Sequence, residues 1–487
     1  MLLRFSSARL RTRSGCADCR RRRKKCDERR PQCGGCARNG LECKWLSETQ
    51  FPDRRRHSKT SEPPDGGGTA PCNTEPVSAR AMGGMSCPGL CLSPPISMPE
   101  PFHTGEHVQL YRYFASSILP RLIRQTSLSR YSVDSHLLRL ALSHAPLMAA
   151  LASIAAMWTV PQSHHQVSIA VASYLFAINA LKNEISNSAL VGNEDWLLAT
   201  TTLLCLFENT RYDSLPKPGC HVKASGRILS IRGPRPRNSS EELLVFERVC
   251  IESFLYHAVL MSLFDSSVDC HSIISDGLDL QGYLSDPAHP DEIGPGASSS
   301  TQPILGAPYK FFVFLSDLVQ LARTSLTPDA NHFRDWARLR DEFLRSQMNR
   351  DSSKDDYGNS IETLYAISID LLLLLTGREP YDGFFEFFEA LVQRGLSIIA
   401  SLEIDIWFSY YYLWPLLLIG SVAVDQSHRE IIREKVVRAS ESRATGPILL
   451  AKSRLEMLWN EGARYEQFHH RVMIYAQFRL LLEGTAS

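Results

Sequence analysis

The sequence predicts three parts in order: a small cysteine-rich module of two short helices, a disordered linker, and a large all-α domain. Three observations predict this order. Six of the 13 cysteines lie within residues 16–43, ten of the 27 prolines lie within residues 46–104, and apolar residues at helical spacing begin near residue 105. With 487 residues, 44% of them hydrophobic, the chain is long enough for a large core in addition to a small module.

The formal net charge of +1 conceals two oppositely charged parts. Residues 1–60 hold 18 Lys/Arg and 6 Asp/Glu, which leaves 35 Lys/Arg and 46 Asp/Glu for the rest of the chain. A compact basic segment favours a polyanionic partner, because each Lys or Arg near a phosphate releases counterions. Arg4, Arg9, Arg11 and Arg13 interrupt the start of the chain, so we expect no secretory signal. In a reducing compartment, clustered cysteines are more often metal ligands than disulfides.

Composition divides the chain into four segments. We expect a basic N-terminal tail at residues 1–13, the cysteine module at 14–45, a disordered Pro/Gly-rich linker at 46–104 and an all-α domain at 105–487. A Pro/Gly/Ser tract predicts a flexible insertion in the last segment, at about 284–308.

Helical periodicity recurs through the last segment. The clearest helical face has spacings of three and four residues and consists of Val167, Val171, Tyr174, Ile178, Leu181 and Ile185. Asn193 is the expected N-cap of a following helix at 196–207. Similar patterns predict helices at 241–264, 310–321, 333–343, 361–375, 384–401 and 464–482.

One uncharged stretch, residues 406–424, is nearly long enough to span a membrane. Pro415 lies in its middle, and Ser409 and Tyr410 through Tyr412 need hydrogen-bond partners. We therefore interpret this stretch as a buried core helix and expect no membrane partner.

The cysteines have a doubled spacing, Cys16-x2-Cys19-x6-Cys26-x6-Cys33-x2-Cys36-x6-Cys43. Two separate tetrahedral zinc sites need eight ligands, so six thiolates can hold two zinc ions only if two sulfurs are shared. An alternative is one zinc ion held by Cys16, Cys19, Cys33 and Cys36, which leaves Cys26 and Cys43 unexplained. In both cases metal binding must supply the folding free energy of so small a module, on the order of 10 kcal/mol.

Every residue between Cys19 and Cys26 is basic, from Arg20 to Lys25. A short basic helix beside a zinc cluster fits the DNA major groove, where Arg contacts guanine O6 and N7 and Lys contacts the same edges or phosphate. A nuclear-import signal is the alternative interpretation, and both can hold at once. A second basic patch, Arg54 to Lys59, is typical of an import or phosphate-contact segment.

The segments 15–28, 30–33 and 38–43 resemble the fungal binuclear zinc-cluster (six-cysteine) transcription factors, with every cysteine spacing in place. The resemblance implies two structural zinc ions bridged by Cys16 and Cys33, a loop proline at Pro31 that is commonly cis, and readout of CGG-like triplets from the first helix. Arg23 stands where the family usually has Lys, and it keeps a donor for guanine.

A second resemblance covers the body. Segments 137–158, 195–208, 225–233 and 414–416 are similar to the fungal-specific helical regulatory domain found downstream of such clusters. Many members dimerise through a coiled coil just after the cluster, but residues 46–75 contain no apolar heptad. A homodimer is therefore possible but is not expected to form by that route.

These observations together predict a DNA-binding module whose fold is held together by zinc, joined to an all-α regulatory domain. We expect a nuclear, sequence-specific DNA-binding regulator of RNA polymerase II transcription, with co-regulators as further partners. Control of a metabolic pathway is the role that the resemblance implies. The predicted zinc ligands are Cys16, Cys19, Cys26, Cys33, Cys36 and Cys43, and the predicted DNA contacts are Arg20, Arg22, Arg23, Lys24 and Lys25. The alternative is a nuclear scaffold whose basic head does not read sequence. We expect no enzyme, since no acid/base or nucleophile constellation is present.

Overall fold

The chain divides into two units, residues 1–90 and 91–487, and each is described separately. The computed structural model describes residues 16, 19, 26–27, 29–38, 40, 43, 98–102, 104–124, 136–159, 163–187, 190–211, 217–265, 269–275, 277–284, 302–324, 329–348, 360–377, 384–404, 411–442, 445–463 and 470–483. The predicted basic tail at 1–13 and residues 46–97 of the linker predicted at 46–104 lie outside these residues. The end of the predicted linker is wrong, because Met98 and Phe102 are buried in the core of the second unit.

The first unit is built around the cysteines. Cys19 is helical, and a short helix α2 (Gly34–Ala37) begins directly after Cys33, which is its N-cap. The Arg30–Pro31 peptide bond is cis. Among the described residues of this unit, the buried ones are Cys16, Cys19, Cys26, Cys33 and Cys36, which pack together as one cluster.

The second unit consists of helices, and no strand occurs in the ranges of this unit given above. Its elements are α3 (Gly105–Tyr113), the π-helical turn η2 (Phe114–Ile118), α4 (Leu119–Leu122), α5 (His136–Ser143), α6 (Ala145–Trp158), α7 (His164–Asn187), α8 (Asp195–Thr210), α9 (Gly219–Arg232), α10 (Glu241–Phe264), α11 (Cys270–Ser275), α12 (Leu280–Leu284), α13 (Tyr309–Thr324), α14 (Ala330–Met348), α15 (Ser360–Gly377), α16 (Phe384–Ser401), α18 (Leu413–Ser421), α19 (Gln426–Ser442), α20 (Gly446–Ala463) and α21 (His470–Glu483).

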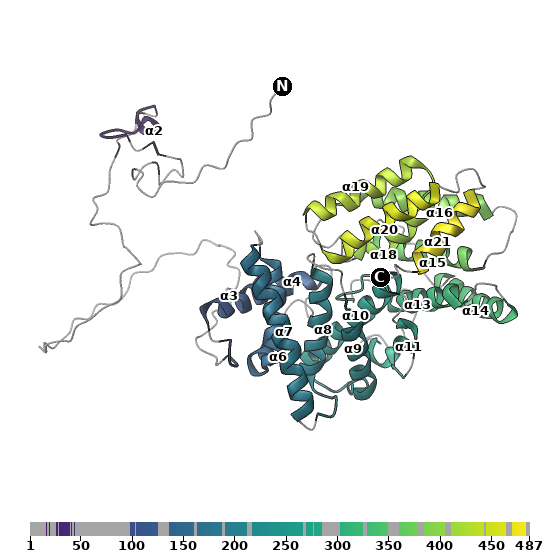
Figure 1. The fold of residues 1–487 in the computed structure, drawn as a ribbon, viewed down its shortest axis with the longest axis horizontal. Helices are drawn as coiled ribbons and strands as arrows, with labels where there is room; N and C mark the ends of the chain where they lie inside the picture. The colour runs from purple at the N-terminus through teal and green to yellow at the C-terminus, as the bar shows by residue number, and fades with distance from the viewer. Residues whose placement is uncertain are drawn as a thin grey trace, which may run out of the picture. The chain divides into compact units, whose positions relative to one another are not determined.

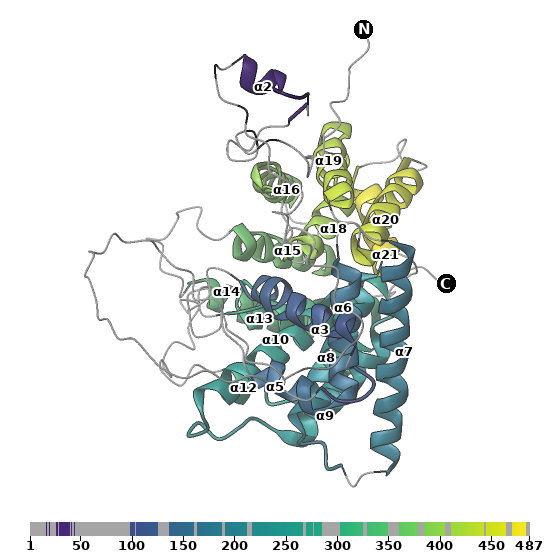
Figure 2. The same ribbon diagram turned by 90° about the vertical axis from the view of Figure 1, so that its left-hand side faces the viewer.

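Helix α6 is the centre of the N-terminal half of this unit. It is rich in alanine, begins with Pro146 in its first turn, and buries every residue from Pro146 to Trp158. Small side chains let neighbouring helices approach closely, and α3, α5, α7 and α8 all pack against it. Figures 1 and 2 show α7 beside α6 along one edge of the unit.

Helices α10 and α15 connect the two halves. Helix α10 packs against α8, α9 and α13, while α15 packs against α13, α14, α16 and α18. The C-terminal helices α18 to α21 gather at the other end of the unit in Figure 1. One continuous hydrophobic core runs from Met98 to Leu482, so the two halves fold as one body.

Periodicity located the main helices correctly. The predicted face from Val167 to Ile185 lies on α7, and the expectations at 241–264 and 384–401 coincide with α10 and α16. The expected N-cap at Asn193 is wrong, because α8 begins at Asp195 with Glu194 as its N-cap. The Glu194 carboxylate accepts hydrogen bonds from the N–H groups of Val191 and Gly192 and so holds the preceding turn.

The uncharged stretch 406–424 contains the short helix α18, in which every residue is buried. Residues 405–410 lie outside the described residues. Another helix, α15, is long and apolar enough to cross a membrane, but 72% of it is buried within the unit. Burial within the unit is the property of a core helix, and both α18 and α15 have it. The predicted flexible insertion falls on 285–301, which is not described, and on 302–308, where Leu305 and Ala307 are buried.

Candidate metal centre

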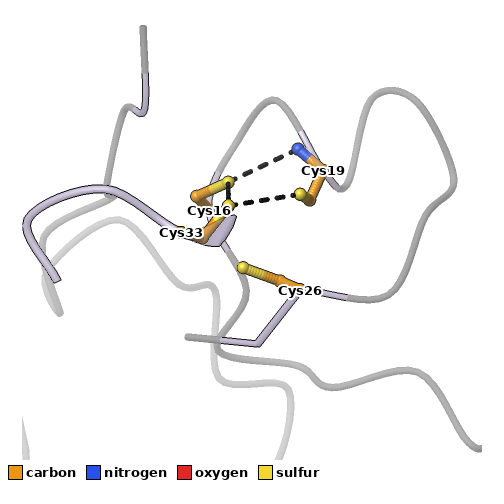
Figure 3. A group of neighbouring side chains, drawn as sticks. All are labelled: Cys16, Cys19, Cys26 and Cys33. Carbon is orange, nitrogen blue, oxygen red and sulfur yellow. Dashed lines mark hydrogen bonds between the residues drawn. The ribbon is translucent and has the colours of Figure 1, made fainter. Parts of the chain in front are cut away.

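The six predicted ligands converge in the first unit. Cys16, Cys19, Cys26, Cys33 and Cys36 are buried, and Cys43 is half-buried. Figure 3 shows four of these side chains turned toward one another, with the sulfurs of Cys16 and Cys33 adjacent.

The internal repeat of the sequence is also a repeat of hydrogen bonds. In each C-x2-C pair, the second cysteine donates its backbone N–H to the sulfur of the first. The distances are 3.5 Å from Cys19 N to Cys16 Sγ and 3.3 Å from Cys36 N to Cys33 Sγ. In a similar contact, the Cys33 N–H donates to Cys43 Sγ at 3.4 Å. These bonds fix the sulfur positions without a large apolar core.

The sulfurs form two groups of four that have two members in common. One group is Cys16, Cys19, Cys26 and Cys33, the other is Cys16, Cys33, Cys36 and Cys43, and within each group the sulfurs lie within 4.8 Å of one another. Cys16 Sγ and Cys33 Sγ, which belong to both groups, are 3.7 Å apart.

The spacing of the sulfurs fits tetrahedral zinc. A tetrahedral sphere with Zn–S bonds of about 2.3 Å places its sulfurs about 3.8 Å apart. Observed separations are 3.7 Å for Cys16 to Cys36 and 3.6 Å for Cys19 to Cys33. A disulfide would place the two sulfurs about 2.05 Å apart, so the sulfurs at these separations are not joined by disulfides. The donor set therefore suits two ions that share two sulfurs.

Burial and mutual hydrogen bonding set the protonation of the thiols. Burial raises the pKa of Cys19 to about 12, and hydrogen bonding to the Cys33 sulfur adds to this effect. Burial also acts on Cys33, but the Cys36 N–H and the neighbouring thiols donate to its sulfur and lower its pKa to about 6. A divalent cation bound by these sulfurs would displace the remaining thiol protons.

Two residues that sequence reasoning missed support the cysteine frame. The Asp27 carboxylate accepts the N–H of Gly34 at 3.1 and 3.0 Å, and this contact ties the segment after Cys26 to the start of α2. A Cβ on Gly34 would lie 2.7 Å from Asp27 Oδ2, so glycine is required for this close approach. The available signal was an acidic residue directly after Cys26, together with two glycines directly after Cys33.

All the predicted DNA contacts, Arg20, Arg22, Arg23, Lys24 and Lys25, lie outside the described residues. Their place in the chain is fixed by Cys19 and Cys26, which precede and follow the basic run and belong to the same group of four sulfurs. The run is therefore held at both ends by the candidate zinc site.

Comparison with known proteins identifies both units. Residues 14–51 match the fungal Zn(2)-Cys(6) binuclear cluster domain, and residues 109–379 match the fungal specific transcription factor domain. The chain belongs to the fungal binuclear zinc-cluster transcription factors. Members of this family are DNA-binding regulators of transcription, and their cluster domain binds two zinc ions.

Individual relatives resemble only a short part of the chain. White-opaque regulator 2 of Candida albicans is 47% identical over 58 residues, which are 12% of this chain and 13% of that protein. Sterol uptake control protein 2 of the same organism is 40% identical over 55 residues, 11% of this chain and 8% of that protein. An uncharacterized transcriptional regulatory protein of Schizosaccharomyces pombe is 48% identical over 50 residues, 10% of this chain and 9% of that protein. No solved structure matches the chain.

Proposed function

We propose that this zinc-cluster protein acts in the nucleus as a site-specific regulator of RNA polymerase II transcription that reads CGG-like triplets. The single observation that carries the proposal is the pair of sulfur groups sharing Cys16 and Cys33, with separations that suit tetrahedral zinc. This arrangement accounts for all six cysteines, including Cys26 and Cys43, which a single four-cysteine site leaves unused.

The six cysteines hold the two zinc ions in a structural role. Cys16 and Cys33 bridge the ions, Cys19 and Cys26 complete one sphere, and Cys36 and Cys43 complete the other. An all-thiolate sphere leaves no position for water or substrate, so these ions stabilise the fold. Binding free energy on the order of 10 kcal/mol replaces the apolar core that about 30 residues cannot form.

The basic run contacts DNA. Arg20, Arg22, Arg23, Lys24 and Lys25 lie between Cys19 and Cys26, so zinc bound by these two cysteines would fix both ends of the run. Arginine can donate two hydrogen bonds to guanine O6 and N7, whereas lysine contacts the same edge or a phosphate. The charge of residues 1–60 supports this assignment, because phosphate contact dominates affinity for DNA.

The remaining segments connect and regulate this head. We assign the linker to the segment that precedes Met98, the first core residue of the helical body, and the regulatory domain to the helical body that follows. The helical body offers co-regulators a folded surface, and control of one metabolic pathway is the role we assign to the whole protein. Without a heptad after the cluster, a homodimer would form through the body.

Selection of bound DNA from a random duplex pool tests the proposal, with the full-length zinc-loaded protein at near-physiological salt. Two CGG-like triplets at a fixed spacing indicate a dimer, and one triplet indicates a monomer. Failure to enrich any sequence, with two zinc ions verified per chain, would contradict site-specific reading and favour the scaffold alternative.

A matched pair of variants separates base contact from phosphate contact. Arg23→Ala should weaken binding to the selected site by about tenfold or more and relax the preference for guanine, since a bidentate base contact is worth about 1–3 kcal/mol. Lys59→Ala should weaken binding to matched and mismatched sites equally. Equal behaviour of the two variants contradicts the assignment of the basic run as the base reader.

A further inference from the structure

A cavity of about 90 Å³ lies in the helical body, between α4, α5, α8 and α10. Its walls are formed mainly by apolar side chains, including Leu119, Leu137, Leu203 and Phe246. Among the described residues that line it, none is Asp, Glu, Lys or Arg. An ion would lose its hydration here without gaining a counter-charge from these residues, so the lining favours an uncharged occupant.

Several neutral polar residues line this apolar space, and two of them lie on one side of α10. Ser253 and His257 are four residues apart and both line the cavity. The Ser253 hydroxyl forms no side-chain hydrogen bond with any described residue, whereas Ser262 of the same helix donates to the Val259 carbonyl at 2.6 Å. Ser253 thus retains its full capacity to bond an occupant.

The neighbour of His257 determines what the imidazole can offer. The Asn209 amide nitrogen lies 2.8 Å from His257 Nδ1, and this nitrogen can only donate, so Nδ1 accepts. Burial lowers the pKa of His257 to about 4, which keeps the ring neutral at physiological pH. A neutral ring with an accepting Nδ1 carries its proton on Nε2, so the histidine offers an N–H donor.

The border of the cavity is fixed by buried contacts. The buried Glu252 carboxylate accepts the N–H groups of Ile304 and Leu305 at 2.9 and 3.1 Å, and Arg248 donates to its other oxygen at 2.5 Å. Ile304 lines the cavity, and Tyr411, from the C-terminal half, lines it too. The cavity is thus preformed where the two halves of the body meet, which is a common position for small-molecule sites.

We propose that this cavity binds an uncharged, mainly apolar small molecule, no larger than about a single ring, that carries one hydroxyl or carbonyl oxygen. This oxygen accepts the Nε2–H of His257, and a hydroxyl also bonds Ser253. An apolar cavity of about 150 Å³ binds benzene, so this smaller cavity limits its occupant to at most one ring. The inference deepens the proposed regulatory role of the body and rests on it only for the consequence of binding, since the binding is measured without DNA.

Saturation-transfer NMR with the full-length zinc-loaded protein tests the proposal. The probes are phenol, which has a ring and a hydroxyl; 2-butanone, which is smaller and has a carbonyl; and benzoate, which is a charged ring. We expect phenol or 2-butanone to bind at least tenfold more tightly than benzoate. Absence of binding by both neutral probes overturns the proposal, and benzoate affinity equal to that of phenol overturns the assigned chemical class.

Cavity-filling variants locate the site. Ser253→Leu should weaken neutral-probe binding at least tenfold. Ala199→Val, a smaller change on the facing helix α8, provides a second filled cavity if Ser253→Leu does not fold. Ser368→Ala removes a buried helical serine that does not line the cavity and should leave binding unchanged. Unchanged binding in folded Ser253→Leu or Ala199→Val places the probe elsewhere and overturns the proposal. DNA selection is independent of these outcomes, so failure here leaves the proposed DNA reading intact.

Discussion

Cys16 Sγ and Cys33 Sγ lie 3.7 Å apart, and each belongs to both groups of four sulfurs. The two residues are the first cysteines of the two C-x2-C pairs, and each sulfur accepts the N–H of the cysteine three residues later. Each C-x2-C pair of the sequence repeat therefore forms the same hydrogen-bonded turn. The two turns place the sulfurs of Cys16 and Cys33 side by side. A ligand at either position affects both halves of the centre.

Removing a shared sulfur should affect zinc content more than removing an unshared one. Cys33→Ser takes a ligand from both groups, whereas Cys36→Ser takes one from the second group alone. With excess zinc followed by desalting, we expect Cys33→Ser to retain less than about one zinc ion per chain and Cys36→Ser to retain about one, because a three-thiolate sphere binds weakly. Elemental analysis against protein concentration measures this.

The control for zinc content is Cys220→Ser, which changes an exposed thiol in the helical body and should retain both ions. Equal loss of zinc from the Cys33 and Cys36 variants would contradict the shared-ligand arrangement.

Close packing at Gly226 makes this position sensitive to any side chain. A Cβ there would lie 2.5 Å from Ile273 Cγ2 and 3.1 Å from Phe254 Cε2, because α9 passes directly over α10 and α11 at this point. Gly226→Val should lower the free energy of unfolding by about 1–3 kcal/mol, in the range of overpacked cores. Urea denaturation followed by circular dichroism measures the loss. Gly105→Ala, where a Cβ meets nothing within 4 Å, should change stability little, and equal effects of the two variants would be inconsistent with the steric argument.

Residue spacing within short segments of the sequence predicted the helices and the metal centre, whereas contacts between distant segments could not be predicted. The helices α7, α10 and α16 follow from apolar spacing, and the metal centre follows from cysteine spacing, because both patterns repeat within a few residues. The N-cap at Asn193 failed since Glu194 competes for the same turn. Contacts such as Asp27 with Gly34, or the cavity between Leu119 and His257, depend on how distant segments pack, and a single sequence carries no direct record of that packing.

The ion-pair network around Asp195 is an example of a contact set that spacing could not reveal. Asp195 accepts from His136 Nε2 at 2.7 Å and from Arg232 at 2.8 Å, and it also pairs with Arg235. Glu247 lies beside both arginines, so four helices and a loop meet at one charged cluster. Burial opposes ionisation, but the hydrogen bonds from Arg232 and His136 lower the pKa of Asp195 below its usual range.

Neutralising Asp195 should therefore destabilise the body strongly. Asp195→Asn leaves the Arg232 side chain, which is 4% exposed, with only Glu247 as a counter-charge. Breaking a buried pair typically costs about 3–5 kcal/mol, and we expect a loss of about 3 kcal/mol in urea unfolding. Glu242→Gln removes the exposed partner of Arg139 and should cost less than about 1 kcal/mol. Comparable losses from both substitutions would show that the Asp195 cluster contributes no more than a surface pair.

Acid should destabilise the body through His257. Burial lowers the folded-state pKa of this histidine to about 4, whereas an exposed histidine in an unfolded chain has a pKa of 6.5. Its neutral form therefore contributes stability that is fully present above about pH 6.5. As the pH falls from 6.5 toward 4, the unfolded chain takes up a proton that the folded chain does not, so this contribution is lost. The difference corresponds to about 3 kcal/mol over this range.

The measurement compares the pH dependence of unfolding in wild-type protein and His257→Gln, from pH 7.5 to 4.5, by urea denaturation of the helical signal. Glutamine retains hydrogen-bonding capacity toward Asn209 but does not titrate, so its profile should be flatter than that of the wild type in this window. His164→Gln, on an exposed side chain of α7, should reproduce the wild-type slope. A His257→Gln profile as steep as the wild-type profile would assign the acid sensitivity to other groups, because protonation of the buried imidazole would then have no measurable cost.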